Sequence, residues 1–260
     1  MGTINTIGFC VLGIPAYFFF AGIGFILSTC FLIILLGLEK YHIQTNIWHF
    51  LFISLSLISF ARGFGVLSGL FRDVGQGKPL TVDGILDTGI VFYGGLFGFL
   101  ISLKIVLKKT KQDEGIIDLV AICIPLFHSI ARIGCFFAGC CFGKEYHGVF
   151  SVSYTSKVVD NVITVQRAPI QLIESIVNFS IFLYLLSLYL TMEYRRENLL
   201  RRYLLIYSIA RFGIEFLRGD LNRGMVLGIS FSQLISIFLW IYLLVTSNVF
   251  ASKYKEEIDL

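Results

Sequence analysis

The sequence is organised around one stretch, His128-Ser-Ile-Ala-Arg132-Ile-Gly-Cys135-Phe-Phe-Ala-Gly139-Cys140-Cys141-Phe-Gly143-Lys144. Between Asp118 and Lys144 the only formal charge is that of Arg132, which interrupts a long apolar run. A lone cation at membrane depth costs on the order of a few kcal/mol, so it needs a compensating role. Arg132 therefore reaches a lipid headgroup, pairs with a buried carboxylate, or binds an anionic ligand. Two more arginines lie at similar depth elsewhere in the sequence, which favours binding of an anionic ligand over the other two roles.

The composition is that of a membrane protein. Of the 260 residues, 56% are hydrophobic and only 15% are charged. A soluble domain does not need so much apolar surface. The net charge of +4 arises from basic residues in the loops, where they set topology and meet anionic lipid, so it does not indicate a nucleic-acid partner.

The apolar segments predict an all-α membrane protein that forms a single polytopic domain over residues 1–260. Seven segments approach the roughly 20 residues that a bilayer requires, although the sixth is short and charged. In chain order they are residues 13–38, 48–71, 85–107, 116–137, 169–192, 202–217 and 226–250. The first apolar run is longer than the region of about 7–15 residues in a signal peptide, so we expect a retained helix.

The basic residues of the connecting segments predict the orientation. One set of alternate loops carries 11 of them: Lys40, Lys104, Lys108, Lys109, Lys111, Arg195, Arg196, Arg201, Arg202, Lys253 and Lys255. The opposite set carries 7: Arg72, Lys78, Lys144, Lys157, Arg167, Arg218 and Arg223. Because cytoplasmic loops are enriched in lysine and arginine, we expect the N-terminus outside and the C-terminus in the cytoplasm.

The longest connection, residues 143–168, is expected to form a small external cap between the fourth and fifth spans. Its segments 148–154 and 162–165 alternate or are β-branched, which predicts a short β-hairpin. Elsewhere, Gly65-x-x-x-Gly69 and Gly94-Gly95-x-x-Gly98 place small residues on one helix face. Such patterns indicate close helix packing, a groove that admits a lipid chain, or both.

Charged residues inside the predicted spans indicate a polar cavity. Arg62 lies in the second span, Glu174 lies early in the fifth, and Arg211, Glu215 and Arg218 lie in and just after the sixth. Spacings of four and three place the last three side chains on one helix face, as a salt-bridge ladder or as the lining of a cavity. Two arginines beside one glutamate leave a net positive charge, and a planar guanidinium donates two hydrogen bonds to a phosphate.

Three other polar residues have simpler explanations. Gln171 donates to a ligand or to the backbone, Asp118 compensates the dipole at the start of a helix, and His128 makes an ordinary polar contact. Neither the histidines nor the cysteines have the spacing of a common zinc site, so no metal is expected.

Six motifs resemble those of the prolipoprotein diacylglyceryl transferases over nearly the whole chain and in the same order. They are Arg62, Tyr93-Gly94-Gly95-Leu96-x-Gly98, Ala131-Arg132-Ile-Gly134-Cys135-Phe136 with Gly139 and Gly143, Pro169-x-Gln171-Leu-x-Glu174, Tyr207-x-x-x-Arg211-Phe-x-x-Glu215-Phe-x-Arg218, and Gly228-Ile-Ser230-x-Ser-Gln233. The resemblance implies a monomeric enzyme of the bacterial inner membrane that needs no metal or organic cofactor.

The reaction implied by the resemblance moves a diacylglyceryl group from phosphatidylglycerol to the lipobox cysteine of a lipoprotein precursor and releases glycerol phosphate. The implied catalytic residues are Arg132, Arg211, Glu215 and Tyr93. The implied substrate-binding residues are Arg62, Gly94, Gly95, Gly134, Gly139, Gln171, Glu174, Arg218 and Gln233.

The chain departs from the family pattern at three positions. Cys135 stands in place of the signature asparagine, Cys140 in place of a frequent acidic residue, and Tyr93 in place of a histidine found in some members. A divergent enzyme with the same lipid donor and another acceptor, or a non-catalytic protein that binds or transports lipid, is therefore an alternative. For Cys135, Cys140 and Cys141, three interpretations are open: compact packing, a disulfide on an oxidising outer side, or a reactive thiol.

Overall fold

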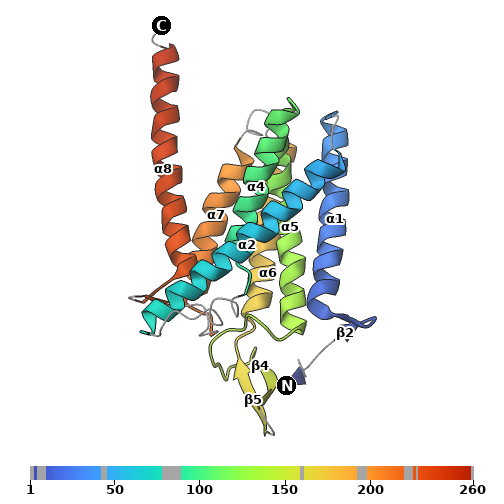
Figure 1. Ribbon diagram of the computed structural model, residues 1–260, viewed down its shortest axis with the longest axis vertical. Coiled ribbons are helices and arrows are strands. Elements are labelled where there is room, and N and C mark those ends of the chain that lie inside the picture. The colour runs from blue at the N-terminus through green and yellow to red at the C-terminus, as the bar shows by residue number, and fades with distance from the viewer. Residues whose placement is uncertain are drawn as a thin grey trace.

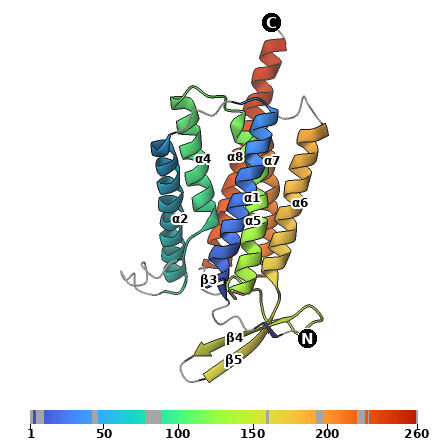
Figure 2. The ribbon, with the colours of Figure 1, turned by 90° about the vertical axis from the view of Figure 1, so that its right-hand side faces the viewer.

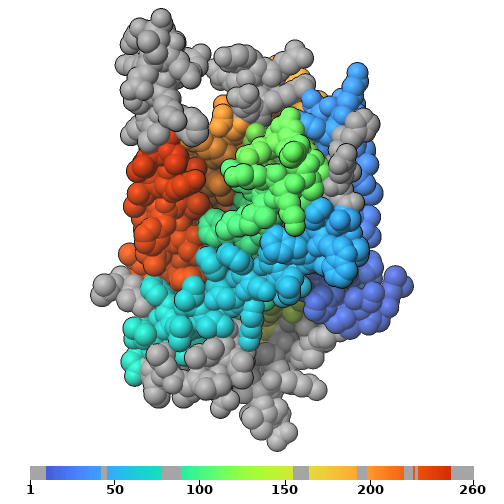
Figure 3. Space-filling view, turned by 45° about the horizontal axis from the view of Figure 1, so that its top comes forward, coloured from blue at the N-terminus to red at the C-terminus, as the bar shows by residue number. Residues whose placement is uncertain are grey.

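The structure, a computed structural model, describes residues 3–4, 10–41, 46–77, 89–158, 161–191, 198–219, 225–226 and 228–258. Within these ranges it contains seven helices (Figure 1): α1 (Ala16–Leu38), α2 (Ile47–Gly75), α4 (Phe92–Lys109), α5 (Ile116–Phe137), α6 (Ile170–Thr191), α7 (Leu199–Glu215) and α8 (Phe231–Ile258). They form one bundle. The space-filling view shows α2 lying obliquely across one face of it, next to α4 (Figure 3).

Each predicted apolar segment overlaps one of these helices, so a mainly helical membrane protein is confirmed. Four helices, α1, α2, α5 and α6, are long and apolar enough to cross a membrane. A shorter apolar stretch, Phe231–Thr246, lies in α8. Residues 85–88 of the predicted third span lie outside the described residues, as do Lys78, Arg195, Arg196 and Arg223.

Helix α5 is the central element of the bundle. It packs against α1, α6 and α7. In its apolar stretch 61% of the residues are buried in the protein, against 22% for α1 and 11% for α2. Pro125 lies inside α5, which membrane helices tolerate because neighbouring groups satisfy the freed backbone. The stretch that carries Arg132 is therefore the core of the molecule, while α1 and α2 expose apolar side chains as lipid-facing helices do.

Glycines on α4 allow it to lie directly against α2. A Cβ atom added at Gly98 would lie 2.6 Å from the carbonyl oxygen of Ser56 and 2.7 Å from Cβ of Phe60. Gly94 meets the backbone of Phe60 and the side chain of Phe64 in the same way. Close helix packing, one of the two interpretations of this glycine pattern, is therefore confirmed.

The predicted hairpin is confirmed and lies at one end of the bundle (Figure 2). Strand β4 (Val152–Val158) pairs antiparallel with β5 (Asn161–Arg167), with Tyr154 opposite Val165. Strand β1 (Thr3–Ile4) adds a parallel edge to β4. Two short antiparallel pairs complete the described strands: β2 (Cys10–Val11) with β3 (Ile14–Pro15), and β6 (Met225–Val226) with β7 (Ile229–Ser230).

The segment after α5 is tied to the end of α7. The amide of Gly219 donates to the carbonyl oxygen of Phe142 at 3.1 Å. The amide of Lys144 donates to the carbonyl oxygen of Leu217 at 3.0 Å. This places the chain beyond Arg132 next to the chain beyond Arg211.

Asp118 has a structural role, as predicted, but on a neighbouring helix as well as its own. It lies in the first turn of α5, and its Oδ1 accepts a hydrogen bond of 2.8 Å from the amide of Leu200. Its Oδ2 accepts one of 3.3 Å from the amide of Asn198. Asp118 therefore caps the start of α7, whose first amides have no partner within the helix.

The substitution Gly98→Ala is expected to destabilise the protein by about 1–3 kcal/mol, because the new methyl group overlaps the backbone of α2. Gly63→Ala, on the partner helix, is the matched control, since a Cβ atom there meets nothing within 4 Å. Thermal unfolding in detergent, followed by the monodisperse fraction, measures both. Equal melting temperatures for the two variants would show that α2 and α4 are not tightly packed.

Candidate functional site

Five buried charged side chains meet where α5, α6 and α7 pack together. We call Arg132, Glu174, Arg211, Glu215 and Arg218 the arginine–glutamate cluster. None of the five side chains is more than 9% exposed. Charges at this depth must face one another or a polar cavity, as the sequence analysis expected.

Glu174 is the centre of the cluster. Its Oε2 forms an ion pair with Nε of Arg132. Its Oε1 lies 3.3 Å from Nη1 of Arg211 and 3.1 Å from Nη1 of Arg218. One carboxylate on α6 therefore holds guanidinium groups from α5, α7 and the segment after α7. Pairing with a buried carboxylate, one of the open explanations for Arg132, is confirmed.

A second carboxylate fixes Arg211 from within its own helix. Oε2 of Glu215 lies 2.5 Å from Nη2 of Arg211, one helical turn away. The same nitrogen donates to Oγ of Ser232 on α8 at 3.3 Å. Arg211, Glu215 and Arg218 therefore share one buried face, as their spacing predicted. The three guanidinium groups and two carboxylates sum to a net charge of +1, which favours an anionic ligand.

A small cavity adjoins the cluster. His128, Asn178 and Tyr207 line it together with Glu174 and Arg211, and it has room for about one water molecule. Nε2 of His128 accepts a hydrogen bond of 3.1 Å from Nε of Arg132. The side chains of His128 and Asn178 interact with each other, and the hydroxyl of Tyr207 finds no hydrogen-bond partner among the described residues. Buried polar atoms of this kind favour a polar group in the cavity.

His128 thus does more than the ordinary contact expected of it, and Asn178, Tyr207 and Ser232 were not identified as site residues. One signal was available in the sequence. Asn178 follows Glu174 by one helical turn, so both lie on the same face of α6. The positions of Tyr207 and Ser232 depend on packing between helices, which spacing along one helix does not reveal.

Tyr93 lies beside this cavity. Its hydroxyl is 2.9 Å from Oγ of Ser236 on α8, and its ring packs edge-on against Tyr207, with the centroids 5.5 Å apart. The side chain is 1% exposed. Tyr93 therefore connects α4, α7 and α8 next to the arginine–glutamate cluster.

The structure places the predicted substrate-binding glycines at packing and turn positions. Gly94 and Gly95 face α2, and a Cβ atom at Gly134 would lie 2.9 Å from Cβ of Phe20 on α1. Gly139 has φ +66° just after α5, in the left-handed region that favours glycine. Arg62 lies half-buried on α2.

The two glutamines also make structural contacts. Nε2 of Gln171 donates to the carbonyl of Cys140 at 2.7 Å, which is the backbone alternative expected for it. The hydroxyl of Tyr154 donates to Oε1 of Gln171 at 3.4 Å, and burial raises the pKa of Tyr154 to about 12, so it stays a hydrogen-bond donor at neutral pH. Oε1 of Gln233 accepts from the amide of Ser230 at 2.9 Å while Oγ of Ser230 accepts from the amide of Gln233 at 3.2 Å. Ser230-x-x-Gln233 is a capping box that starts α8.

Three cysteines lie at the end of α5, beside Arg132. None of the six described cysteines forms a disulfide, so the structure does not contain the disulfide that was one of the three interpretations. Nη1 of Arg132 lies 4.0 Å from Sγ of Cys135, and Sγ of Cys140 lies 3.7 Å from the carbonyl oxygen of Cys135. Hydrogen bonding within this group and burial raise the pKa of the Cys140 thiol.

Comparison with known proteins identifies the family. The family model described as prolipoprotein diacylglyceryl transferase matches residues 6–248. The chain is 30% identical to phosphatidylglycerol–prolipoprotein diacylglyceryl transferase 2 of Clostridium perfringens, over 95% of the chain and 94% of that protein. It is 36% identical to the enzyme of that name from Clostridium tetani, over 59% of the chain and 61% of that relative. The chain belongs to the prolipoprotein diacylglyceryl transferase family.

Proposed function

We propose that this protein transfers a diacylglyceryl group from phosphatidylglycerol to the cysteine thiol of a lipoprotein precursor, with release of glycerol phosphate. The names of its relatives state this activity for those proteins. The observation that carries the proposal here is the buried arginine–glutamate cluster with its net charge of +1. A phospholipid is a ligand that brings a phosphate into such a site from the membrane.

Arg132 and Arg211 are the phosphate-binding groups in this proposal. The substrate thiolate attacks a glycerol carbon of the lipid, a C–S bond forms, and the bond from that carbon to the phosphate oxygen breaks. Negative charge then grows on the leaving glycerol phosphate. Guanidinium groups already fixed in a site of low dielectric stabilise that charge without reorganising.

Glu174 and Glu215 are positioning residues. Glu174 engages Nε of Arg132, so the Nη edge of that guanidinium faces the end of α5, where Nη1 approaches Cys135. Glu215 holds Nη2 of Arg211. Two carboxylates therefore aim two guanidinium groups while keeping the cluster positive.

The arginines also favour the reactive form of the acceptor, because nearby cations lower the pKa of a thiol. Tyrosine is a weak acid and its anion is rare at neutral pH, so Tyr93 orients substrate rather than removing the proton. The other residues implied by the resemblance complete the substrate site in this proposal, and the glycines and glutamines shape its walls. They are Arg62, Gly94, Gly95, Gly134, Gly139, Gln171, Arg218 and Gln233.

We place the protein in the bacterial inner membrane as a monomer with seven spans, the N-terminus outside and the C-terminus in the cytoplasm. The excess of basic loop residues on one side supports this orientation. The hairpin of β4 and β5 then forms a cap on the outer side, at the same end of the bundle as the end of α5. Lipid donor and precursor would meet there.

A second candidate is favoured by Cys135. The family signature resembled by this chain has an asparagine at that position, and here a thiol lies 4.0 Å from the Nη1 atom of Arg132. The same lipid donor with another acceptor fits this change, and so does a non-catalytic protein that binds or transports lipid.

Arg132→Lys is expected to lower transfer by about 10²–10³-fold, because lysine keeps the charge but loses the planar pair of donors. Arg202→Lys on α7, away from the cluster, is the matched control and should keep full activity. The assay combines protein in phosphatidylglycerol vesicles with a lipobox peptide, and follows peptide mass and glycerol phosphate together.

The outcomes of this assay separate the candidates. A mass gain of one diacylglyceryl group, lost in Arg132→Lys, supports the proposal. Phosphate release without peptide modification supports another acceptor. If neither peptide modification nor glycerol phosphate release is detected, while a related enzyme is active in the same assay, the result supports the non-catalytic protein.

Glu174→Gln is expected to destabilise the fold by about 3–5 kcal/mol, because three buried guanidinium groups lose their common counter-charge. Glu114→Gln, which removes a solvent-exposed partner of Lys104, should cost about 0–1 kcal/mol. Denaturant unfolding in mixed micelles compares the two variants. A Glu174→Gln protein as stable as the control would mean that the arginines are held by other groups.

A further inference from the structure

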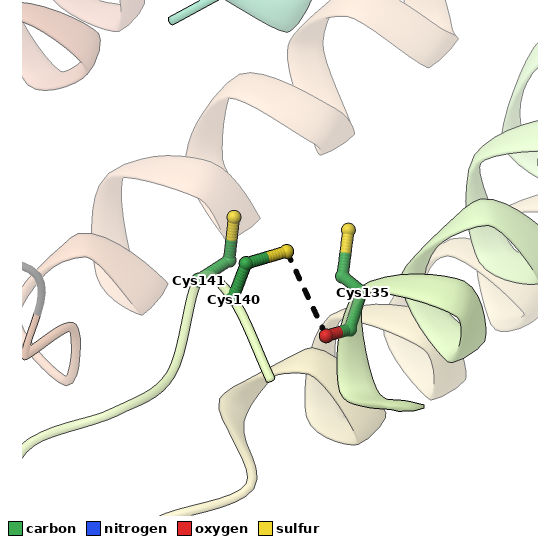
Figure 4. Close-up of side chains that lie close together, drawn as sticks. All are labelled: Cys135, Cys140 and Cys141. Atoms are coloured by element: carbon green, nitrogen blue, oxygen red, sulfur yellow. Dashed lines mark hydrogen bonds between the residues drawn. The ribbon is translucent and has the colours of Figure 1, made fainter. Parts of the chain in front are cut away.

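Three thiols gather at the end of α5. The Sγ atoms of Cys135, Cys140 and Cys141 all lie within 4.8 Å of one another. Figure 4 shows the three side chains with their sulfur atoms on the same side of the turn. We propose that these cysteines bind one soft, monovalent, thiophilic metal ion, for which Cu(I) is the probe, as three thiolates.

The local backbone explains why the first two thiols meet. The amide of Cys140 donates to the carbonyl of Cys135 at 3.2 Å, and that of Gly139 donates to the carbonyl of Phe136 at 3.2 Å. With Gly139 at φ +66°, this is a Schellman motif, in which the residue after the glycine contacts the residue five positions earlier. Cys135 and Cys140 occupy those two contact positions.

The third thiol is held in place by an unusual backbone conformation. Cys141 has φ +60°, in the left-handed region that residues other than glycine rarely adopt. The turn before it is fixed from α6, because Nε2 of Gln171 donates to the carbonyl of Cys140 at 2.7 Å. The three sulfur atoms are therefore presented by an anchored turn and not by a loose loop.

The spacing suits a single ion. A bond of about 2.3 Å from metal to sulfur places the sulfur atoms of a trigonal site about 4 Å apart. None of the distances between these sulfur atoms is greater than 4.8 Å, so small side-chain rotations close the site. Cys140 and Cys141 are half-buried, which leaves a path for the ion, while Cys135 is buried.

The donor set selects the kind of ion. Among the described residues, this group contains only cysteines and no histidine or carboxylate. Thiolates prefer soft ions such as Cu(I), whereas zinc sites take a fourth ligand. No metal is expected from the sequence because Cys135-x₄-Cys140-Cys141 is not a zinc spacing, but three sulfur atoms suffice for a three-coordinate ion.

The surrounding charge supports the complex. Three thiolates and one monovalent cation carry a charge of −2, and the adjoining arginine–glutamate cluster carries +1. Nη1 of Arg132 already lies 4.0 Å from Sγ of Cys135. On binding, three S–H bonds break, three S–metal bonds form and three protons pass to solvent, with no change of oxidation state. Affinity therefore falls as the pH is lowered.

Occupancy of this site would draw Arg132 toward the metal–thiolate group and away from a phosphate. This consequence rests on the proposed function, since it requires that Arg132 bind the lipid phosphate during transfer. Metal binding itself does not depend on the transfer reaction, so the two are tested separately.

The test is anaerobic titration of the reduced full-length protein in detergent with Cu(I) buffered by a chromogenic chelator. We expect one equivalent of Cu(I) per chain, with a sulfur-to-copper absorption band in the ultraviolet. Cys140→Ser should weaken binding on the order of 100-fold. The double variant Cys10→Ser/Cys30→Ser is the matched control, because it removes two exposed thiols elsewhere and should bind as the unmodified protein does.

Several results would overturn the proposal. These are no retained Cu(I) in the reduced protein, equal affinity in Cys140→Ser, or loss of binding in the double variant. Cys141→Ser carries the same test if Cys140→Ser is not monodisperse. A protein that binds Cu(I) but never modifies a lipobox peptide would count against the proposed function alone. A protein that transfers the lipid group but does not bind Cu(I) would count against the metal site alone.

Discussion

The rest of this structure depends on the ion pairs that Glu174 forms with three arginines. Three guanidinium groups cannot lie together in a protein core within a membrane without a counter-charge. Their mutual repulsion is poorly screened there, and each group loses its hydration. Glu174 supplies that charge from α6 to Arg132 on α5 and to Arg211 and Arg218 at the end of α7. The relative positions of three helices are thereby fixed by one carboxylate.

The positive excess of the cluster links this architecture to function. A fully neutral cluster would hold the helices equally well, but it would have no preference for a phosphate. Here the second carboxylate, Glu215, pairs with Arg211 and the sum stays positive. The side chains that stabilise the helix packing are therefore the same ones that bind the phosphate in the proposed function.

Two of the three departures from the family pattern, Cys135 and Cys140, lie at the end of α5. Gly139 ends the helix in the left-handed conformation, and the chain turns back so that Cys140 meets Cys135 beside Arg132. The same turn therefore borders the proposed phosphate site and brings the thiols together.

The sequence by itself determined what depends on neighbours along the chain. Apolar runs of sufficient length specified the helices, alternation specified the hairpin, and a spacing of four paired Arg211 with Glu215, because these patterns follow from helix and strand periodicity. Only the tertiary structure decided which carboxylate pairs with Arg132, that Asp118 caps α7, and that Tyr207 and Asn178 share a cavity with His128. Those contacts join residues on different helices, and their pairing is set by how the helices pack, which no spacing within one helix encodes.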